Sequence, residues 1–191
     1  MNAKKVLVLS GSTRPGSLNR KLAEAVAAHL RGHGMEVTFP ETSEYELPIY
    51  SGRIEEQQGI PEAAHRLHDA IRTHRAIFIA SPEYNANVSP LVLNAVAWLS
   101  RIRENGGMQA AFGNPVYAIG SASPGGFGGY RGLMALRNTL ELGVGARVLP
   151  AMISVGMANQ AFNEQGEITS PVPLQMLETM TSQLKRALNE I

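Results

Sequence analysis

Ten residues near the start of the chain have the composition of an anion-binding loop. The stretch SGSTRPGSLN, residues 10–19, follows an apolar run at 6–9 and precedes a helical pattern. A helix N-terminus carries unpaired N–H groups and a partial positive charge, and both attract anions. Arg14 adds a planar fork that matches two phosphate oxygens. The side chains that could donate further hydrogen bonds are Ser12, Thr13, Ser17 and Asn19. The stretch therefore predicts a site for a phosphate monoester.

Two nucleotide-binding motifs are absent from this loop. The spacing from Gly11 to Gly16 and Ser17 lacks the lysine of a P-loop, and no G-x-G-x-x-G pattern occurs here. Hydrolysis of a nucleoside triphosphate therefore loses support. A plain turn from strand to helix, capped by Ser17, is the alternative explanation. Arg14 and Asn19 favour the anion site, because a plain turn does not require them.

A second polar stretch, SPEYNANVSP at residues 81–90, follows another apolar run. Its two prolines stiffen the backbone, and Tyr84 and Asn85 supply an aromatic ring and an amide. A flat ligand is held by this combination of rigid backbone and ring-packing side chain. The alternative is a structural turn capped by Ser89.

A third stretch, GSASPGGFGGYRG at residues 120–132, contains six glycines and runs into a further helical pattern. Glycine allows the backbone to approach a ligand closely, although such a run could also be only flexible. Open parallel sheets bind ligands beyond the carboxyl ends of their strands. Because all three stretches follow predicted strands, we expect them to meet at one site.

The elements that position these loops alternate regularly along the chain. Strands are predicted at 4–10, 35–39, 75–81, 115–121 and 146–150, and helices at 18–31, 61–73, 89–104, 129–142 and 172–190. The first and third strands are nearly all apolar, as expected for strands covered on both faces. The pattern predicts an α/β protein with a flavodoxin-like, doubly wound, five-stranded parallel sheet in the order 2-1-3-4-5 and helices on both faces.

Length, cysteine content and charge exclude several classes of protein. A length of 191 residues predicts a single domain over 1–191. The chain has no cysteine, which excludes disulfides, thiolate nucleophiles and cysteine-ligated metals. The 17 basic and 16 acidic residues give a net charge of +1, which argues against a nucleic-acid partner. No signal peptide or membrane span is evident, so we expect a cytoplasmic protein without a membrane partner.

Together the three stretches resemble the NADPH-dependent FMN reductase family. The resemblance rests on GSTRPGSLN, SPEYNANVSPLVLNAVAWLSR and SASPGGFGGYRGLMALRNTL, in that order, over about 150 residues. The combination of P-E-Y-N with the later N-A-x-x-W is its most specific part. Members of this family have a flavodoxin-like fold and reduce flavins, quinones, azo compounds or chromate. The phosphate predicted at the first loop would then be the ribityl phosphate of FMN.

The resemblance implies a set of cofactor-binding residues. The FMN phosphate would be held by Ser12, Arg14, Ser17 and Asn19, with Leu18 assigned to the same set. Pro82, Glu83, Tyr84 and Asn85 would lie beside the isoalloxazine ring, and Ser121, Gly125 and Gly126 would close the site. NADPH or NADH would pass a hydride to flavin N5, and a small acceptor would then take the same place in ping-pong turnover. This scheme needs no side-chain acid or base, so no catalytic residue and no metal ligand is predicted.

Two other functions compete with this interpretation. The first is a flavodoxin-type electron carrier, against which the near-neutral charge argues. The second is a metal-dependent hydrolase that uses His65, His68 and Asp69, because the two histidines are three residues apart on a predicted helix. The simpler explanation of the second pattern is a solvated helix face rich in charged residues.

The helix predicted at 89–104 has two apolar stripes, which suggests a subunit interface. One stripe consists of Leu91, Ala95, Trp98 and Ile102, and the other of Leu93 and Ala97. A helix that is apolar on two faces usually buries both, so we expect a homodimer or homotetramer. A wide intramolecular core face is the alternative. Leu93 and Ala97 replace charged residues of the family pattern, which often serve subunit contacts. The segments at 41–60 and 156–171 are predicted loops and candidate lids or interface arms.

Overall fold

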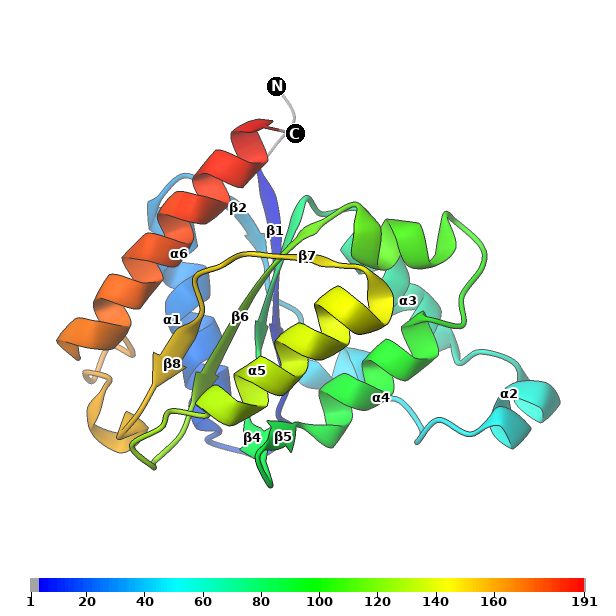
Figure 1. The fold of residues 1–191 in the computed structure, drawn as a ribbon, viewed down its shortest axis with the longest axis horizontal. Helices are drawn as coiled ribbons and strands as arrows, with labels where there is room; N and C mark the ends of the chain where they lie inside the picture. Colours follow the sequence, from blue (N-terminus) through cyan, green and yellow to red (C-terminus); the bar gives the residue numbers. More distant parts are fainter. Residues whose placement is uncertain (1–3, 191) are drawn as a thin grey trace.

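A computed structural model describes residues 4–190, and a parallel β-sheet runs through its centre (Figure 1). The strands along the sheet are β2 (Glu36–Thr38), β1 (Lys5–Ser10), β3 (Ala76–Ala80), β6 (Val116–Ala122) and β7 (Arg147–Val148). Each neighbouring pair is parallel. The observed order confirms the predicted 2-1-3-4-5 arrangement.

Helices cover both faces of the sheet, as the apolar strands predicted. One layer consists of α1 (Leu18–Gly32) and α6 (Pro171–Glu190), and the other of α3 (Glu62–Arg72), α4 (Pro90–Leu99) and α5 (Tyr130–Asn138). Side chains alternate along β1, where Val6 and Val8 join the core beneath the first layer and Leu7 and Leu9 join the core beneath the second. Both sets are buried, which is why no polar alternation appears in this strand.

The fifth strand differs from the single run predicted at 146–150. It is divided into β7 and β8 (Ile153–Val155), which lie beside successive parts of β6. The physical reason is Pro150, which has no N–H to donate to a neighbouring strand. Side chains satisfy the backbone at the break, because Arg137 donates to the carbonyl of Leu149 and the N–H of Ala151 donates to Gln183 over 3.0 Å.

Two predicted helices differ from the structure at their C-terminal ends. The helix predicted at 89–104 ends at Leu99, where the Ser100 hydroxyl donates to the carbonyl of Ala97 over 2.8 Å and competes with helical hydrogen bonding. The helix predicted at 129–142 continues from α5 into a wider turn over Thr139–Gly143. The remaining predicted helices agree with the structure to within one residue.

The segments predicted as loops contain short helices. Residues 41–60 include a 3₁₀ helix at Thr42–Tyr45 and α2 (Gly52–Gln58), which has no buried residue and lies away from the sheet (Figure 1). Residues 156–171 include a 3₁₀ turn at Ala158–Gln160. Throughout residues 4–190, no helix combines the length and apolar character that crossing a bilayer requires.

Candidate functional site

A groove lies at the carboxyl ends of β1, β3 and β6, where the three polar stretches meet. Its volume is about 380 Å³, within the usual range for small-molecule sites. The residues that line it are Ser12, Arg14, Pro15, Gly16, Ser17, Leu18, Asn19, Lys21, Pro82, Glu83, Tyr84, Ala122, Ser123, Pro124 and Asn159. Eight of the twelve predicted cofactor-binding residues are therefore brought together here. Asn85, Ser121, Gly125 and Gly126 do not line the groove.

The first loop, residues 11–17, presents polar groups that lack protein partners. In the part of the chain that the structure describes, the backbone N–H groups of Ser12, Thr13, Gly16 and Leu18 have no acceptor. The Arg14 guanidinium likewise makes no hydrogen bond or ion pair to a described residue, and its side chain is exposed. Unpaired donors at a helix N-terminus, together with one free positive charge, are the requirements of an anion site.

Ser17 and Asn19 hold this loop in position. The Ser17 hydroxyl caps α1 by accepting from the N–H groups of Asn19 and Arg20 at 3.2 and 3.4 Å. The buried Asn19 amide donates to the carbonyl of Ala122 and accepts from the N–H of the same residue, both at 2.9 Å. One side chain thus joins the start of α1 to the end of β6. Asn19 remains a predicted phosphate contact, but its amide oxygen and nitrogen already support the scaffold.

Two other side chains near the first loop, Tyr45 and Arg20, are paired. Tyr45 is buried beneath it, and its hydroxyl both donates to the carbonyl of Ser10 and accepts from the Ser10 N–H, each at 3.1 Å. Arg20 forms a bidentate ion pair with Glu41, with two contacts of 2.8 Å. The positive charge of Arg20 is therefore compensated, whereas that of Arg14 is not.

The stretch at 81–89, the hairpin loop, contains a small β-hairpin that the sequence analysis did not predict. Strands β4 (Glu83–Tyr84) and β5 (Asn87–Val88) pair in antiparallel register across a two-residue turn. Both turn residues have left-handed backbone conformations, with φ of +52° at Asn85 and +61° at Ala86. Such a turn normally contains Asn-Gly, and alanine in the second position gives no comparable signal. The hairpin places Tyr84 at the groove and turns Asn85 away from it.

Glu83 connects the hairpin loop to the start of α5. Its carboxylate accepts from the guanidinium of Arg131 and from the backbone N–H of Gly132 at 3.0 Å. Burial of Glu83 opposes its ionisation, but the hydrogen bonds from Gly132 and Arg131 outweigh burial and hold its pKa below the ordinary value. Glu83 is therefore an ionised scaffold residue as well as a residue that lines the groove.

The glycines of the glycine loop, residues 123–129, have different surroundings: some lie against neighbouring atoms and others face open space. Gly129 has a φ of +78°, and a Cβ there would collide with the hydroxyl of Ser121. That hydroxyl is buried and has no partner among the described residues, so Ser121 lies behind the loop rather than in the groove. Gly125 and Gly126 are open on the side where a Cβ would project, with no atom nearer than 3.7 Å. These two residues stay predicted cofactor contacts.

Lys21 and Asn159 line the groove but were not predicted. Lys21 lies three residues after the first residue of α1, one turn beyond the N-terminus, and its helical position is a signal that could have been used. Asn159 comes from the turn after β8, far away in the sequence. It lies in the segment 156–171, which was predicted as a candidate lid or interface arm, but no residue of that segment was assigned to the cofactor site.

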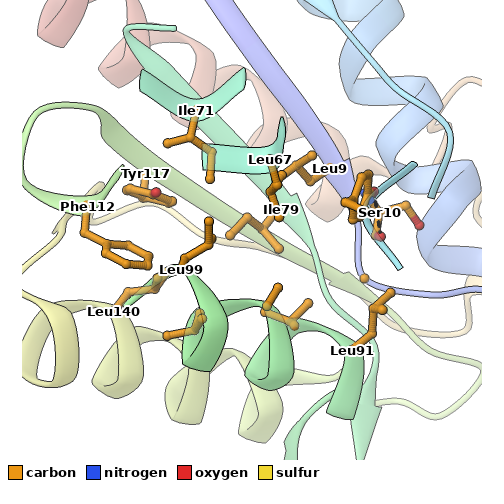
Figure 2. Close-up of a pocket in the computed structure, with 15 residues that line it drawn as sticks. Leu9, Ser10, Leu67, Ile71, Ile79, Leu91, Leu99, Phe112, Tyr117 and Leu140 are labelled. Carbon is orange, nitrogen blue, oxygen red and sulfur yellow. Dashed lines mark hydrogen bonds between the residues drawn. The ribbon is translucent and has the colours of Figure 1, made fainter. Parts of the chain in front are cut away.

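A second pocket lies among side chains of the core and differs from the groove in chemistry, because its lining is almost entirely apolar. Figure 2 shows its apolar lining between the sheet and helices α3 and α4, with Ile79, Leu99 and Phe112 among the side chains that face it. Its volume of about 40 Å³ is far too small for a flavin. A pocket of this size and lining is a gap in the packing of the core rather than a cofactor site.

The metal-dependent hydrolase alternative is not supported by the geometry. His68 is buried, and its Nε2 lies 2.9 Å from the carbonyl of Gly107. Asp69 forms an ion pair with Arg72 at 2.6 Å. Within residues 4–190, the three candidates do not form a group with converging ligand atoms. His68 is a core histidine with a satisfied ring nitrogen.

Comparisons with known proteins identify the family of this chain. A profile of the NADPH-dependent FMN reductase family matches residues 4–160. The NAD(P)H-dependent FMN reductase of Pseudomonas aeruginosa is 31% identical over 95% of this chain and 93% of that protein. The quinone reductase of Escherichia coli K12 is 30% identical over 94% of this chain and 90% of that protein. A solved structure of a flavoenzyme NAD(P)H:(acceptor) oxidoreductase from Paracoccus denitrificans has a TM-score of 0.78, at 26% identity over 98% of both chains. This chain belongs to the NADPH-dependent FMN reductase family.

Proposed function

We propose that this protein is an FMN-dependent oxidoreductase that takes electrons from NADPH or NADH and passes them to a small acceptor. Family membership supports the general class, flavin-dependent oxidoreduction with NAD(P)H. Quinone reductases among the relatives favour a quinone as the acceptor, and free flavins, azo compounds and chromate are the other candidates. The observation that carries the proposal is the set of unpaired donors in the first loop.

The residues of the groove fit the phosphate end of FMN. Four backbone N–H groups without acceptors lie within residues 12–18, in the loop before α1 and at its first residue, and the unpaired guanidinium of Arg14 belongs to the same loop. A dianionic phosphate would satisfy several of these donors at once and would lie at the positive end of the helix dipole. Lys21 adds a second positive charge along the groove. When bound, FMN would supply the hydride chemistry that links oxidation of NAD(P)H to reduction of the second substrate, for which we propose a ping-pong order.

The chain itself contributes position rather than proton transfer. Among the residues that line the groove, the titratable side chains are Arg14, Lys21, Glu83 and Tyr84. The Glu83 carboxylate is held by Arg131 and Gly132 and is therefore committed to the scaffold. The hairpin and the glycine loop then form walls of fixed shape around a flat ligand. A groove of this kind orients substrates and leaves the redox step to the cofactor.

One spectroscopic experiment tests the proposal. The purified protein, loaded with FMN, should lose its visible flavin band under anaerobic NADPH without any partner protein, and a quinone should restore the band. If FMN binds but neither NADPH nor NADH bleaches it, the protein is instead an electron carrier of the flavodoxin type. If no flavin binds, both functions fail.

We further propose that the exposed side of α4 forms a contact in a homodimer or homotetramer. Leu93 is exposed there, and the neighbouring segment carries Ile49, which is 84% exposed. That segment is fixed to α4, because the N–H of Tyr50 donates to the Asn94 amide oxygen over 2.7 Å. Light scattering should show smaller particles for Leu93→Glu and no change for Leu142→Glu, a matched control on the surface after α5. A monomeric wild type would refute the proposal.

A further inference from the structure

The C-terminal end of α1 carries a cluster of metal-ligating side chains that the flavin chemistry does not use. His29 and His33 are one helical turn apart, and Glu178 of α6 lies beside them. One ligand atom from each of the three residues lies within 4.8 Å of the other two. We propose that these three residues bind a borderline divalent cation such as Zn²⁺ and so clamp α1 to α6.

The ring nitrogens are arranged to accept a metal. The Nδ1 of His33 lies 2.9 Å from the carbonyl of His29, which fixes Nδ1 as the donor and leaves the Nε2 lone pair of His33 free. The Nε2 of His29 is buried and has no hydrogen-bond partner among the described residues. Metal-binding histidines commonly donate their second ring nitrogen to a backbone carbonyl in this way. A cation would satisfy both free nitrogens together.

The spacing of the three groups suits a single ion. The His29 and His33 rings lie 4.2 Å apart between centroids, and the His29 Nε2 is 3.7 Å from a carboxylate oxygen of Glu178. Two imidazoles and one carboxylate form a zinc ligand set with a fourth position left for water. Mg²⁺ and Ca²⁺ prefer all-oxygen sites, so the ligand set selects against them.

The charges around the site are mixed. The last carbonyls of α1 give this end of the helix a partial negative charge. His29 also lines a groove of about 530 Å³ that includes Glu24 and Glu167, which provides a path for an ion. Lys185 of α6, near His29, and Arg31, in the last turn of α1, are opposing positive charges. The groove for FMN begins at the other end of α1, roughly 20 Å away for a helix of this length, so the two sites are separate.

Isothermal titration of the FMN-loaded, tag-free protein with ZnSO₄ tests the proposal. We expect saturable binding of one Zn²⁺ per chain and no binding of Mg²⁺ under the same conditions. His33→Ala and Glu178→Gln, both at exposed positions, should each lower the Zn²⁺ affinity at least about tenfold, because each removes one ligand. His65→Ala on α3 is the matched control and should retain the wild-type affinity.

A second measurement separates metal binding from folding and from the proposed function. Zn²⁺ should raise the thermal midpoint of the wild type and of His65→Ala but not that of His33→Ala, because only a folded site binds the ion. FMN content and NADPH-driven bleaching should be the same in all variants. Absence of saturable Zn²⁺ binding by the wild type, or a wild-type Zn²⁺ affinity in His33→Ala and Glu178→Gln, would overturn the proposal. Failure of flavin reduction would leave the metal result unaffected.

Discussion

The first loop and the hairpin loop border the same groove but use their polar groups in opposite ways. In the first loop, the backbone N–H groups of Thr13 and Gly16 and the guanidinium of Arg14 have no acceptor among the described residues. In the hairpin loop, the one charged side chain, Glu83, is bound to two partners at the start of α5. Unpaired polar groups indicate where a ligand is expected, and paired groups indicate what holds the groove open. The paired Asn19 lies only a few residues after the unpaired donors, so groups that support the groove and groups expected to bind the ligand are close together in the sequence.

The largest expected effect is on stability, in Asn19→Ala. This change removes both hydrogen bonds to Ala122 and leaves its backbone N–H and carbonyl buried without partners. We expect the free energy of unfolding to fall by about 2–4 kcal/mol, since each unsatisfied buried group costs about 1–3 kcal/mol. Urea unfolding measures the loss. Asn19→Asp keeps the hydrogen-bond acceptor and loses the donor. Its free energy of unfolding should therefore lie between those of the wild type and Asn19→Ala. A loss below that of a typical surface substitution would show that Asn19 is not a scaffold residue.

Arg14→Ala should affect cofactor binding without affecting the fold. Arg14 has no partner to lose within the described chain, so the unfolding free energy should stay close to that of the wild type. FMN affinity should fall about 10- to 100-fold, because a charge-assisted contact contributes about 1.5–3 kcal/mol. Fluorescence titration with FMN and with riboflavin measures the difference. Riboflavin has no phosphate, so the affinity of the variant for riboflavin should change little. Equal losses of affinity for both flavins would show that Arg14 does not act on the phosphate.

Glu83→Gln should give a smaller, pH-dependent loss of stability. We expect about 1–2 kcal/mol, mostly from the hydrogen bond to Gly132, because the Arg131 guanidinium is largely exposed to solvent. The pKa of Glu83 lies below its ordinary value of 4.5 in the folded protein. Its carboxylate therefore stabilises the fold fully above about pH 4.5, and this contribution is lost as the pH falls through the lower folded value. The thermal midpoints of wild type and variant should differ at neutral pH and converge in acid. A difference that stays constant with pH would show that the ionised Glu83 carboxylate is not its cause.

Ala86→Gly should have the smallest effect, and it should stabilise the protein. Ala86 has a φ of +61° at the hairpin turn, where a Cβ is unfavourable. Glycine removes that strain, although it gains freedom in the unfolded chain, and we expect a net gain of about 0.5–1 kcal/mol. The thermal midpoint is the measurement. Asn85 provides the control, since asparagine tolerates this conformation better than alanine and Asn85→Gly should gain less.

The regular elements could be predicted because their signals are local. The apolar runs of β1 and β3 and the alternation of strands with helices indicated the sheet and its order. The first loop was predictable for the same reason, since glycines, hydroxyls and Arg14 are adjacent in the sequence. The groove-lining residues Pro82, Glu83 and Tyr84 were assigned through resemblance to a family rather than from their chemistry alone.

The features that were not predicted depend on long-range packing. The hairpin turn at Asn85–Ala86 lacks the expected glycine, so its sequence reads as a loop. β8 pairs with the part of β6 that lies beyond the break at Pro150, and the run of Ile153–Val155 is too short to indicate a separate strand by itself. The bond between Glu83 and Gly132 joins residues 49 positions apart. Local patterns cannot show that such a pair will meet.

The link from Asn19 to Ala122 also determines what happens to the groove when it holds no ligand. Because this link and the Ser17 cap are made by the protein alone, the first loop needs no cofactor to reach its shape. Binding then requires little ordering of the backbone, and most of the interaction energy is retained as affinity. The apoprotein should stay folded after the flavin is removed and should accept flavin analogues of the same outline. In a preformed binding site of this kind, the cofactor can be exchanged while the protein remains folded.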